Sequence, residues 1–381
     1  MSRLDELLRE LCPNGVEHKK IKEVYRRIKG TPITAAKMKE IACDDGEIRV
    51  FAGGKTVINA HEEDIPNANI TRVPAVLVQS RGVIDAVYYD EPFTFKNEMW
   101  AYTADERISV KFLYYVLKNN IQQFRDAASG MGSLPQISLP VTEEFIMPVP
   151  PLEVQSEIVR ILDNFTELTA ELTAELTAEL TARKKQYEYY RNELLSFDEN
   201  VPMLTLPEIS INCDRQRKPV TKGNREAGEY PYYGASGIVD YVADYLFDGD
   251  YLLVSEDGAN LLARSTPIAF SISGKNWVNN HAHVLQFETY EMRKYVEIYL
   301  NSIDLSKYIS GGAQPKLNQE NLNKIPIPVP SFERVKQIVD ILVRFDSLCT
   351  SMNNGLPAEI EARQKQYEYY RDKLLTFKEL T

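Results

Sequence analysis

The sequence has few cysteines, and none of them is paired as in a metal or redox motif. The four in the 381 residues stand far apart, at Cys12, Cys43, Cys213 and Cys349. Disulfide frameworks and zinc sites usually show clustered cysteines. Residues 281–283, His-Ala-His, place two imidazoles on one face of a strand, but no further ligand lies near them in the sequence. We therefore expect reduced, structural thiols and no metal or other cofactor.

Long apolar segments are also missing. No run approaches the ~18 apolar residues of a membrane-spanning helix. The first residues, MSRLDELLRELC, carry charges where a signal peptide would be apolar. The hydrophobic content of 44% and the charged content of 26% are ordinary for a globular protein. We expect a cytoplasmic chain without membrane contact, and its length favours at least two domains.

Positive charge is scarce, since 44 Lys and Arg residues stand against 55 Asp and Glu residues, for a net charge of −11. This balance argues against nucleic-acid binding, because contacts to phosphate require lysine and arginine. The basic residues nevertheless cluster in two stretches, 19–29 and 215–225. A solvated surface is the plainer interpretation of either cluster alone. If the chain binds DNA, more basic partners should supply part of the affinity.

Catalytic motifs are missing as well. The string closest to a methyltransferase motif, Asp90–Phe93, lacks the first of the two prolines. Gly54-Lys55-Thr56 resembles the end of a phosphate-binding loop, but Arg49 stands where the first glycine is required. Residues 130–132, Gly-Met-Gly, lack the third glycine and the strand–helix context of a dinucleotide site. The sequence therefore predicts no catalytic residue.

What the sequence does contain is an internal duplication. Residues 147–197 align with residues 327–377 without a gap, at an offset of 180 residues, and ARKKQYEYYR matches ARQKQYEYYR. Each copy opens with a proline-rich segment that cannot be helical. An apolar pattern at helical spacing follows. Its members are Val154, Ile158, Ile161, Leu162 and Phe165 in the first copy and Val335, Ile338, Ile341, Leu342 and Phe345 in the second.

The two copies predict two long helices that differ in one respect. The first copy continues without interruption for about 43 residues, or about 65 Å at ~1.5 Å per residue. The second copy contains Asn353-Asn354-Gly355-Leu356-Pro357 in its middle, where we expect a kink or a break. At the N-terminus, Glu6–Arg9 resembles Glu193–Ser196. This faint echo suggests that the N-terminal segment docks beside the second helix and closes a pseudo-symmetric circle.

Between the helical segments lie two blocks with short β-branched runs, such as Ala75–Val78 and Tyr251–Val254, that predict strand-rich α/β domains. Gly53-Gly54 is interpreted as a tight turn equivalent to Gly234–Gly237. The expected fold is α+β, with two α/β domains separated by two long antiparallel helices in a pseudo-two-fold duplication. The expected boundaries are 1–15 for an N-terminal helical stub, 16–146 for the first domain, 147–200 for the central helix, 201–326 for the second domain and 327–381 for the C-terminal helix.

The first helix alone carries three tandem TAEL units, Thr169–Leu172, Thr173–Leu176 and Thr177–Leu180. The plainer interpretation is a low-complexity helical spacer, since Ala, Glu and Leu are strong helix formers. Four residues also turn a helix by a net ~40° and advance it by ~6 Å. One base pair turns B-DNA by about 34–36°. One unit therefore rotates whatever the helix carries almost as far as one base pair does.

The helix openings PVP(P/S)(L/F)E, the segments Tyr232–Ile238 and Val254–Ala259, and the TAEL units together resemble type I restriction–modification specificity subunits. The resemblance covers essentially the whole chain. It implies two target-recognition domains that each read half of a bipartite, asymmetric double-stranded DNA target. It further implies two methyltransferase subunits, restriction subunits with ATP-driven translocation, and no active site in the chain itself. The TAEL units resemble those of a subgroup in which their number sets the spacer length of the target.

Candidate DNA contacts follow from residue type, since Arg, Lys, Asn and Gln make most contacts to base edges and phosphates. The loops Ser80–Gly82 and Ser255–Gly258 are further candidates by position. The predicted contact residues are Arg26, Arg27, Lys29, Lys55, Arg81 and Lys96 in the first domain and Arg215, Arg217, Lys218, Lys222, Arg225, Tyr233 and Lys275 in the second.

Two alternatives stay open from the sequence. The chain could be a coiled-coil scaffold whose two heads bind protein, and a fused methyltransferase ranks behind it because cofactor motifs are absent. The duplicated tyrosines near the ends of the long helices could either pack between the helices or bind partners. They are Tyr187, Tyr189 and Tyr190 in the first copy and Tyr367, Tyr369 and Tyr370 in the second.

Overall fold

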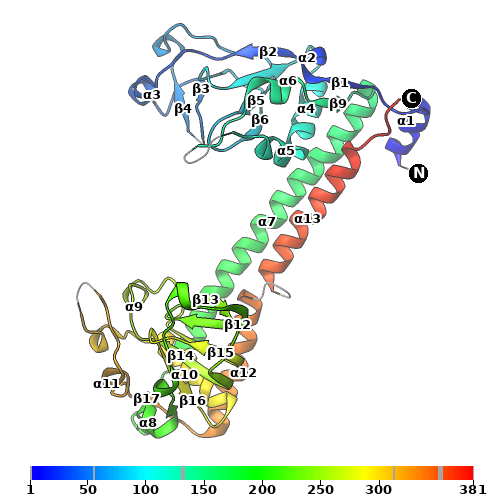
Figure 1. Cartoon of the computed structure of the whole chain (residues 1–381). Coiled ribbons are helices and arrows are strands. Elements are labelled where there is room, and N and C mark those ends of the chain that lie inside the picture. The colour runs from blue at the N-terminus through cyan, green and yellow to red at the C-terminus, as the bar shows by residue number, and fades with distance from the viewer. Residues whose placement is uncertain (1, 55, 130–133, 312–313, 351–354, 381) are drawn as a thin grey trace. The chain divides into compact units, whose positions relative to one another are not determined.

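The computed structural model describes residues 2–54, 56–129, 134–311, 314–350 and 355–380. The chain divides into two compact units. Unit 1 comprises residues 1–175 and 360–381, and unit 2 comprises residues 176–359. Each unit contains one of the two blocks, residues 16–146 (block 1) or 201–326 (block 2), together with segments from both long helical copies (Figure 1). Within the described residues, no helix is both long enough and apolar enough to cross a membrane.

The first helical copy is one helix, α7 (Leu152–Leu194), of 43 residues. The second copy forms two helices, α12 (Phe332–Thr350) and α13 (Leu356–Leu375). The helix is thus interrupted before Pro357, as predicted, while Asn353 and Asn354 of the predicted break lie outside the described residues. Pro357 lies in the first turn of α13, where its missing N–H has no partner to lose. In unit 1, α13 lies beside α7 and runs antiparallel to it (Figure 1).

Block 1 forms two sheets, with strand orders β2-β8-β5-β6 and β4-β3-β7. A short pair, β1 with β9, closes the block where the chain enters and leaves it. The elements of unit 1 before α7 are α1 (Arg3–Leu11), β1 (His18–Lys20), α2 (Ile21–Val24), β2 (Arg26–Lys29), α3 (Ala35–Ile41), β3 (Ile48–Phe51), β4 (Val57–Ala60), η1 (Glu62–Asp64), β5 (Ala75–Gln79), β6 (Asp85–Tyr89), β7 (Phe93–Phe95), β8 (Trp100–Thr103), α4 (Arg107–Asn119), α5 (Ile121–Asp126), α6 (Leu139–Glu143) and β9 (Ile146–Pro148).

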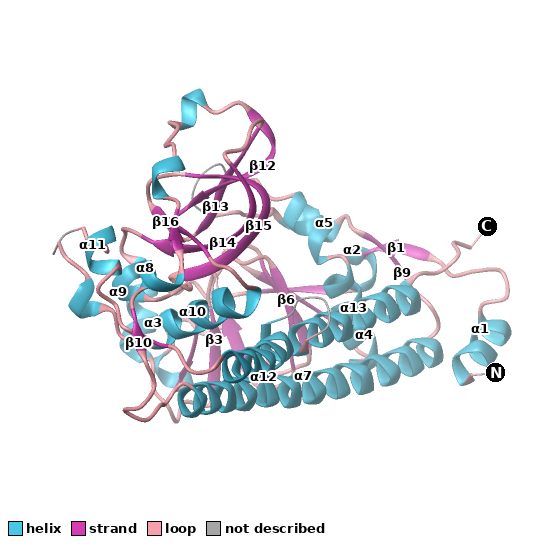
Figure 2. Cartoon of the chain, turned by 90° about the horizontal axis from the view of Figure 1, so that it is seen from below, coloured by secondary structure: helices cyan, strands magenta, loops and turns pink. Residues whose placement is uncertain are grey.

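Block 2 forms one six-stranded sheet of order β11-β16-β14-β15-β12-β13, whose longer strands are grouped in Figure 2, and a closing pair of β10 with β17. Its elements are β10 (Met203–Leu204), α8 (Leu206–Ile209), β11 (Ile211–Asn212), η2 (Asp214–Gln216), η3 (Lys222–Asn224), β12 (Ala227–Gly234), β13 (Gly237–Val242), β14 (Phe247–Ser255), α9 (Asn260–Ala263), β15 (Ala269–Val278), β16 (Ala282–Gln286), α10 (Tyr290–Ser302), η4 (Ser306–Tyr308), α11 (Gln319–Leu322) and β17 (Ile327–Pro328).

The two blocks share one strand connectivity. In both, a hairpin (β3–β4 or β12–β13) pairs in parallel with a later strand, β7 or the end of β15. Strand β15 is continuous, whereas block 1 has two strands, β6 and β7, in its place. The turn at Gly53-Gly54 connects β3 to β4, and the turn at residues 235–236 connects β12 to β13. The proposed equivalence of these two turns is therefore confirmed.

Each core is built from the same three layers. In unit 1, Val76 and Val78 of the sheet, Val116 of α4 and Leu162 of α7 belong to one buried cluster. Unit 2 repeats this order with Leu252 and Val254 of β14, Val296 of α10 and Leu342 of α12. Burying a leucine or valine side chain stabilises a fold by roughly 1.5–3 kcal/mol. The apolar stripe of each long helix therefore anchors its block.

Two residues of the predicted stripes are exposed, and one of them is Phe165 of α7, at 36%. Ile341 is 44% exposed, while Val339, which the stripe omitted, is 1% exposed. The buried face of α12 is thus rotated slightly from the predicted one. A helix face is wider than a single row of positions, so several i, i+3 and i, i+4 choices fit the same sequence.

Aromatic pairs between the antiparallel helices repeat at the 180-residue offset. In unit 1, Phe165 of α7 stacks on Tyr370 of α13 with ring centroids 5.8 Å apart. In unit 2, Phe345 of α12 contacts Tyr190 of α7 at 6.1 Å. Positions 165 and 345, like 190 and 370, are the same positions of the two sequence copies. The sequence duplication is therefore also a duplication of helix pairing.

The N-terminal helix packs against the C-terminal segment within unit 1. Leu4 of α1 and Leu375 of α13 belong to the same buried cluster. The Val16 N–H donates to the Lys378 carbonyl (2.8 Å), and the Leu380 N–H donates to the Val16 carbonyl (3.0 Å). The predicted docking beside the second helix is confirmed.

Candidate nucleic-acid interface

Block 1 has a cleft of about 530 Å³ beside the Gly53-Gly54 turn. Arg81 and Lys96, two predicted contact residues, both line it, and Lys39 of α3 joins them. The ammonium of Lys96 lies 3.1 Å from the Glu98 carboxylate, whereas Arg81 is exposed. Lys55, predicted from the same turn, lies outside the described residues.

The loop after β5 in block 1 has a counterpart after β14 in block 2. Arg81 forms an isolated bridge with Gln136, and Asp257 forms the equivalent bridge with Lys316. The Gly82 N–H donates to the Pro135 carbonyl, and the Gly258 N–H donates to the Pro315 carbonyl (2.9 and 3.1 Å). We call these the paired loops, residues 80–82 with 134–136 and 255–258 with 314–316. The same backbone arrangement thus carries Arg and Gln in one block and Asp and Lys in the other.

Sequence reasoning did not include Gln136 and Lys316 among the contact residues. Both are exposed, and both side chains suit recognition of base edges or phosphates. The available signal was the match between residues 130–136 and 310–316, which the backbone bridges now tie to the loops after β5 and β14. Residues 130–133 and 312–313 of these segments lie outside the described residues.

Arg26, Arg27 and Lys29 lie on β2 at the edge of the four-stranded sheet. Arg26 pairs with Asp105 at 3.2 Å, and Arg27 lies 3.9 Å from the Glu143 carboxylate. All three side chains are exposed. Exposed ion pairs of this kind contribute at most about 1 kcal/mol, so these cations can exchange their partners for phosphates.

In block 2, the guanidinium of Arg217 is bonded to groups of the block itself. Its guanidinium lies 2.7 Å from Glu256 and 3.3 Å from Asp214, and it donates to the Ala282 carbonyl at 2.7 Å. His283, 1% exposed, bonds Asp214 through Nδ1 (2.6 Å) and the Leu317 carbonyl through Nε2 (2.8 Å). His283 thus has carboxylate neighbours that are distant in the sequence, and its two ring nitrogens are used in bonds within the block. His281, outside this network, is exposed and pairs with Asp257 at 2.9 Å.

The two carboxylates of this network are held ionised. Burial is the largest single effect and disfavours their charged forms, but at Asp214 the hydrogen bond and charge of His283, the Val284 N–H and the charge of Arg217 together outweigh it and lower the pKa of that carboxyl. The Arg217 hydrogen bond, the charge of His283 and Lys316 likewise outweigh burial and lower the pKa of Glu256. Because Lys316 pairs with Glu256 at 3.1 Å, the network connects the interior to the paired loop of block 2.

Of the other predicted contact residues of block 2, two pack within the block, Arg225 and Tyr233, and four lysines and arginines are exposed. Arg225 is internally bonded, with Asp240 at 2.9 Å and the Tyr232 ring 4.3 Å below its guanidinium. Lys275 is exposed and lies 4.7 Å from the ring centre of Tyr245, and half-buried Tyr233 packs on Phe270. The remaining three are exposed: Arg215, Lys218 and Lys222.

A family model described as the type I restriction modification DNA specificity domain matches residues 13–182 and 201–362. The specificity subunit of the type I restriction enzyme EcoR124I/EcoR124II from Escherichia coli is 32% identical over 363 residues, which cover 88% of each chain. The specificity subunit of the Escherichia coli enzyme EcoprrI is 36% identical over 256 residues, or 64% of this chain and 62% of that protein.

Solved structures share the fold at low sequence identity. The S subunit of a type I restriction–modification system from M. genitalium matches with a TM-score of 0.52 and 19% identity, covering 94% of this chain and 96% of that one. A chain from a study of complex assembly and conformational transition in the type I system gives a TM-score of 0.64 at 13% identity, with 96% and 98% covered.

The chain therefore belongs to the type I restriction–modification DNA specificity family. It is the DNA specificity subunit of such a system, a non-catalytic component that acts together with partner subunits. The alternatives of a protein-binding scaffold and of a fused methyltransferase are thereby set aside.

Replacing Arg217 with alanine is expected to destabilise unit 2 by up to about 3 kcal/mol, because two largely covered carboxylates lose their guanidinium partner while Lys316 and His283 still compensate part of their charge. Urea denaturation at pH 7 measures the loss. Arg215→Ala, an exposed arginine two residues away, should change stability by at most about 0.5 kcal/mol. An Arg217→Ala protein as stable as the wild type would contradict the assignment.

The stability difference between the wild type and Arg217→Ala is predicted to depend on pH. Since the pKa values of Asp214 and Glu256 are lowered on folding, their contribution is present above about pH 4.3, the ordinary glutamate pKa. It is lost as the pH falls through the lowered values. The stability difference between wild type and Arg217→Ala should therefore shrink below pH 4.

Proposed function

We propose that each block is a target-recognition domain that reads one half of a bipartite, asymmetric DNA sequence. The observation that carries this proposal is the pair of equivalent loops with different side chains, Arg81 and Gln136 in one block and Asp257 and Lys316 in the other. Arginine and lysine recognise guanine, glutamine recognises adenine and aspartate accepts from cytosine. One frame that presents two different sets of such groups suits a target with two unlike halves.

We assign DNA contacts to cations that are exposed or line the cleft, and structural roles to cations that are bonded within their block. In block 1 we assign base or phosphate contacts to Arg81 and Lys96 in the cleft, and phosphate contacts to the exposed cations of β2. In block 2 the paired-loop residue Lys316 joins the exposed cations Arg215, Lys218 and Lys222. Arg217 and Arg225 instead hold the block together, because their donors are used within it.

We propose that two methyltransferase subunits bind the duplicated helix frame and that restriction and translocase subunits join through the complex. Tyr189 and Tyr369, equivalent positions of the two copies, are 60% and 62% exposed. A duplicated surface of this kind can serve two identical subunits. With a net charge of −11, the chain needs more basic partners to hold DNA firmly. We place the complex in the cytoplasm, where the four free cysteines stay reduced.

DNA selection with the assembled methyltransferase complex tests this function. The chain is co-purified with its methyltransferase, and bound DNA is recovered from a random library. Two fixed blocks of bases at one constant spacing are expected. A single continuous block, or no enrichment, would sink the bipartite proposal while leaving the fold untouched.

We further propose that the three TAEL units place the chain in the subgroup whose unit number sets the spacer of the DNA target. All three units lie within α7. In each unit the leucine is less exposed than the glutamate: Leu176 is 8% exposed, and Leu172 and Leu180 are half-buried. Their glutamates Glu171, Glu175 and Glu179 are exposed. Each unit therefore turns its glutamate to solvent and its leucine toward partly or fully covered surface, which allows units to be added or removed without exposing a leucine.

Deletion of Thr177–Leu180 should shorten the preferred spacer of the target by about one base pair, because the deleted unit contributes a net turn of ~40°. The two half-sites themselves should stay unchanged. The measurement is the same selection, run in parallel with wild type. An unchanged spacer would contradict the spacer role, and Thr177→Ser, which keeps the length, serves as the control.

Arg81→Ala should alter the first half-site alone, with a loss of about 1–3 kcal/mol in discrimination at one position if the guanidinium contacts a base. A uniform loss at all sequences would instead identify a phosphate contact. Binding constants on single-base variants of the selected target measure both. Arg72→Ala, an exposed arginine of block 1 paired with Glu62, is the matched control. If the Arg81→Ala protein binds every target as tightly as the wild type does, Arg81 does not contact DNA.

A further inference from the structure

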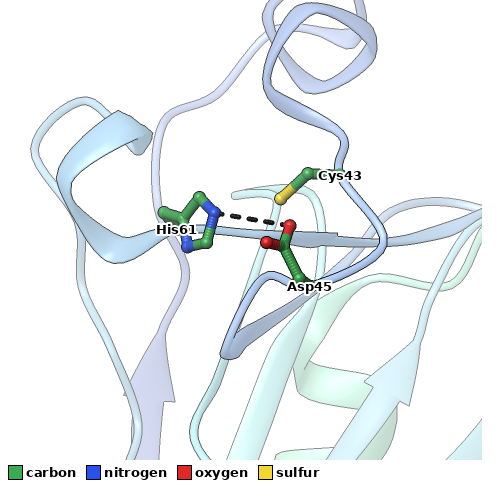
Figure 3. Close-up of side chains that lie close together, drawn as sticks. All are labelled: Cys43, Asp45 and His61. Carbon is green, nitrogen blue, oxygen red and sulfur yellow. Dashed lines mark ion pairs between the residues drawn. The ribbon is translucent and has the colours of Figure 1, made fainter.

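Three side chains that can bind metal meet at one edge of block 1. Cys43 and Asp45 lie in the loop after α3, and His61 follows β4. Their ligand atoms all lie within 4.8 Å of one another, and His61 Nε2 is 3.5 Å from the Asp45 carboxylate. Figure 3 shows the three side chains pointing toward one common point. Cysteine spacing alone did not reveal this cluster, because its other members are not cysteines.

The backbone holds the cluster together. The Cys43 N–H donates to the Asn59 carbonyl at 3.0 Å, which fixes the start of the loop beside β4. Gly46 then passes so close that a Cβ at this position would lie 2.4 Å from the Ala60 nitrogen. Only glycine allows this approach, and it places Asp45 and Glu47 on the two sides of His61.

A fourth residue orients the imidazole. Glu47 accepts from His61 Nδ1 (2.8 Å) and from the Glu62 N–H (2.8 Å). With Nδ1 bonded to Glu47, the other ring nitrogen, Nε2, faces Asp45 at 3.5 Å. A histidine that binds a metal through one ring nitrogen usually donates a hydrogen bond from the other, often to a carboxylate.

We propose that Cys43, Asp45 and His61 bind one Zn²⁺ ion, with Glu47 as a positioning residue and water in the fourth place. A thiolate, an imidazole and a carboxylate together suit zinc, whereas Ca²⁺ and Mg²⁺ prefer oxygen ligands alone. Ligand atoms of tetrahedral zinc lie about 3.3–3.8 Å apart, so the side chains need to close by about 1 Å. The Cys43 thiol releases its proton when the Zn–S bond forms.

The ion would connect the loop after α3 to the end of β4. Both segments border the cleft that contains Arg81 and Lys96, since Ala42 and Ile58 line it next to Cys43 and Asn59. Zinc therefore stabilises a wall of the recognition cleft without touching DNA. The second group of this kind in the described residues, Asp214, Glu256 and His283, takes no ion, because Arg217 and Lys316 already neutralise its carboxylates.

Zinc titration of the full chain in its methyltransferase complex tests the site, with a chromophoric chelator as competitor. The wild type should bind one Zn²⁺ that Cys43→Ser or His61→Ala weakens at least about tenfold, and Glu47→Gln should weaken it by about 10–100-fold. Cys12→Ser and His18→Ala, which alter residues of the same types elsewhere in unit 1, should bind as the wild type does. Co²⁺ in place of zinc should give a thiolate charge-transfer band that Cys43→Ser abolishes.

Melting temperatures separate a lost site from a lost fold. In EDTA, Cys43→Ser, His61→Ala and the wild type should melt alike, and added Zn²⁺ should raise the melting temperature of the wild type alone. Should Cys43→Ser unfold, Asp45→Asn replaces it, since the Asp45 side chain is 85% exposed. Equal zinc affinity in wild type and the Cys43→Ser/His61→Ala double variant would overturn the proposal. A loss caused by Cys12→Ser would do the same.

Discussion

The contact on which the structure depends is the burial of one apolar stripe of each long helix under a helix and a sheet of its own block. Leu162 and Leu342 are both fully buried at equivalent positions of the two copies. Since these side chains recur after 180 residues, each block meets its helix in the same register. The paired loops consequently arise at the same place in both units, and they can vary in side chain without changing the frame.

Burial also decides what each cation can do. Arg217 faces two carboxylates that the interior could not hold alone, so its charge is used to neutralise them. Arg81 and Arg215, with exposed side chains, face solvent and can turn toward a phosphate or a base. The specificity subunit thus has a shortage of positive charge, with 44 Lys and Arg residues against 55 Asp and Glu residues. This shortage is consistent with a component that binds DNA as part of a larger complex.

Much of the fold could be predicted because the signals are local or periodic. The unbroken α7, the interruption before Pro357 and the matched turns each follow from spacing or from the chemistry of proline and glycine. The candidate site was predicted less completely. Arg81 was found by its loop, whereas Gln136 and Lys316 were missed, because only backbone pairing brings them beside that loop and its counterpart.

By itself the sequence determined the duplication, the helix pattern, the family resemblance and the three TAEL units, all of which are written in residue order. Tertiary structure alone decided which cations are free, and it brought Cys43 to His61 and Arg217 to Glu256. The physical reason is that charge neutralisation and metal binding act between side chains that meet across loops and strands. Their partners lie some tens of residues away, where no local pattern marks them.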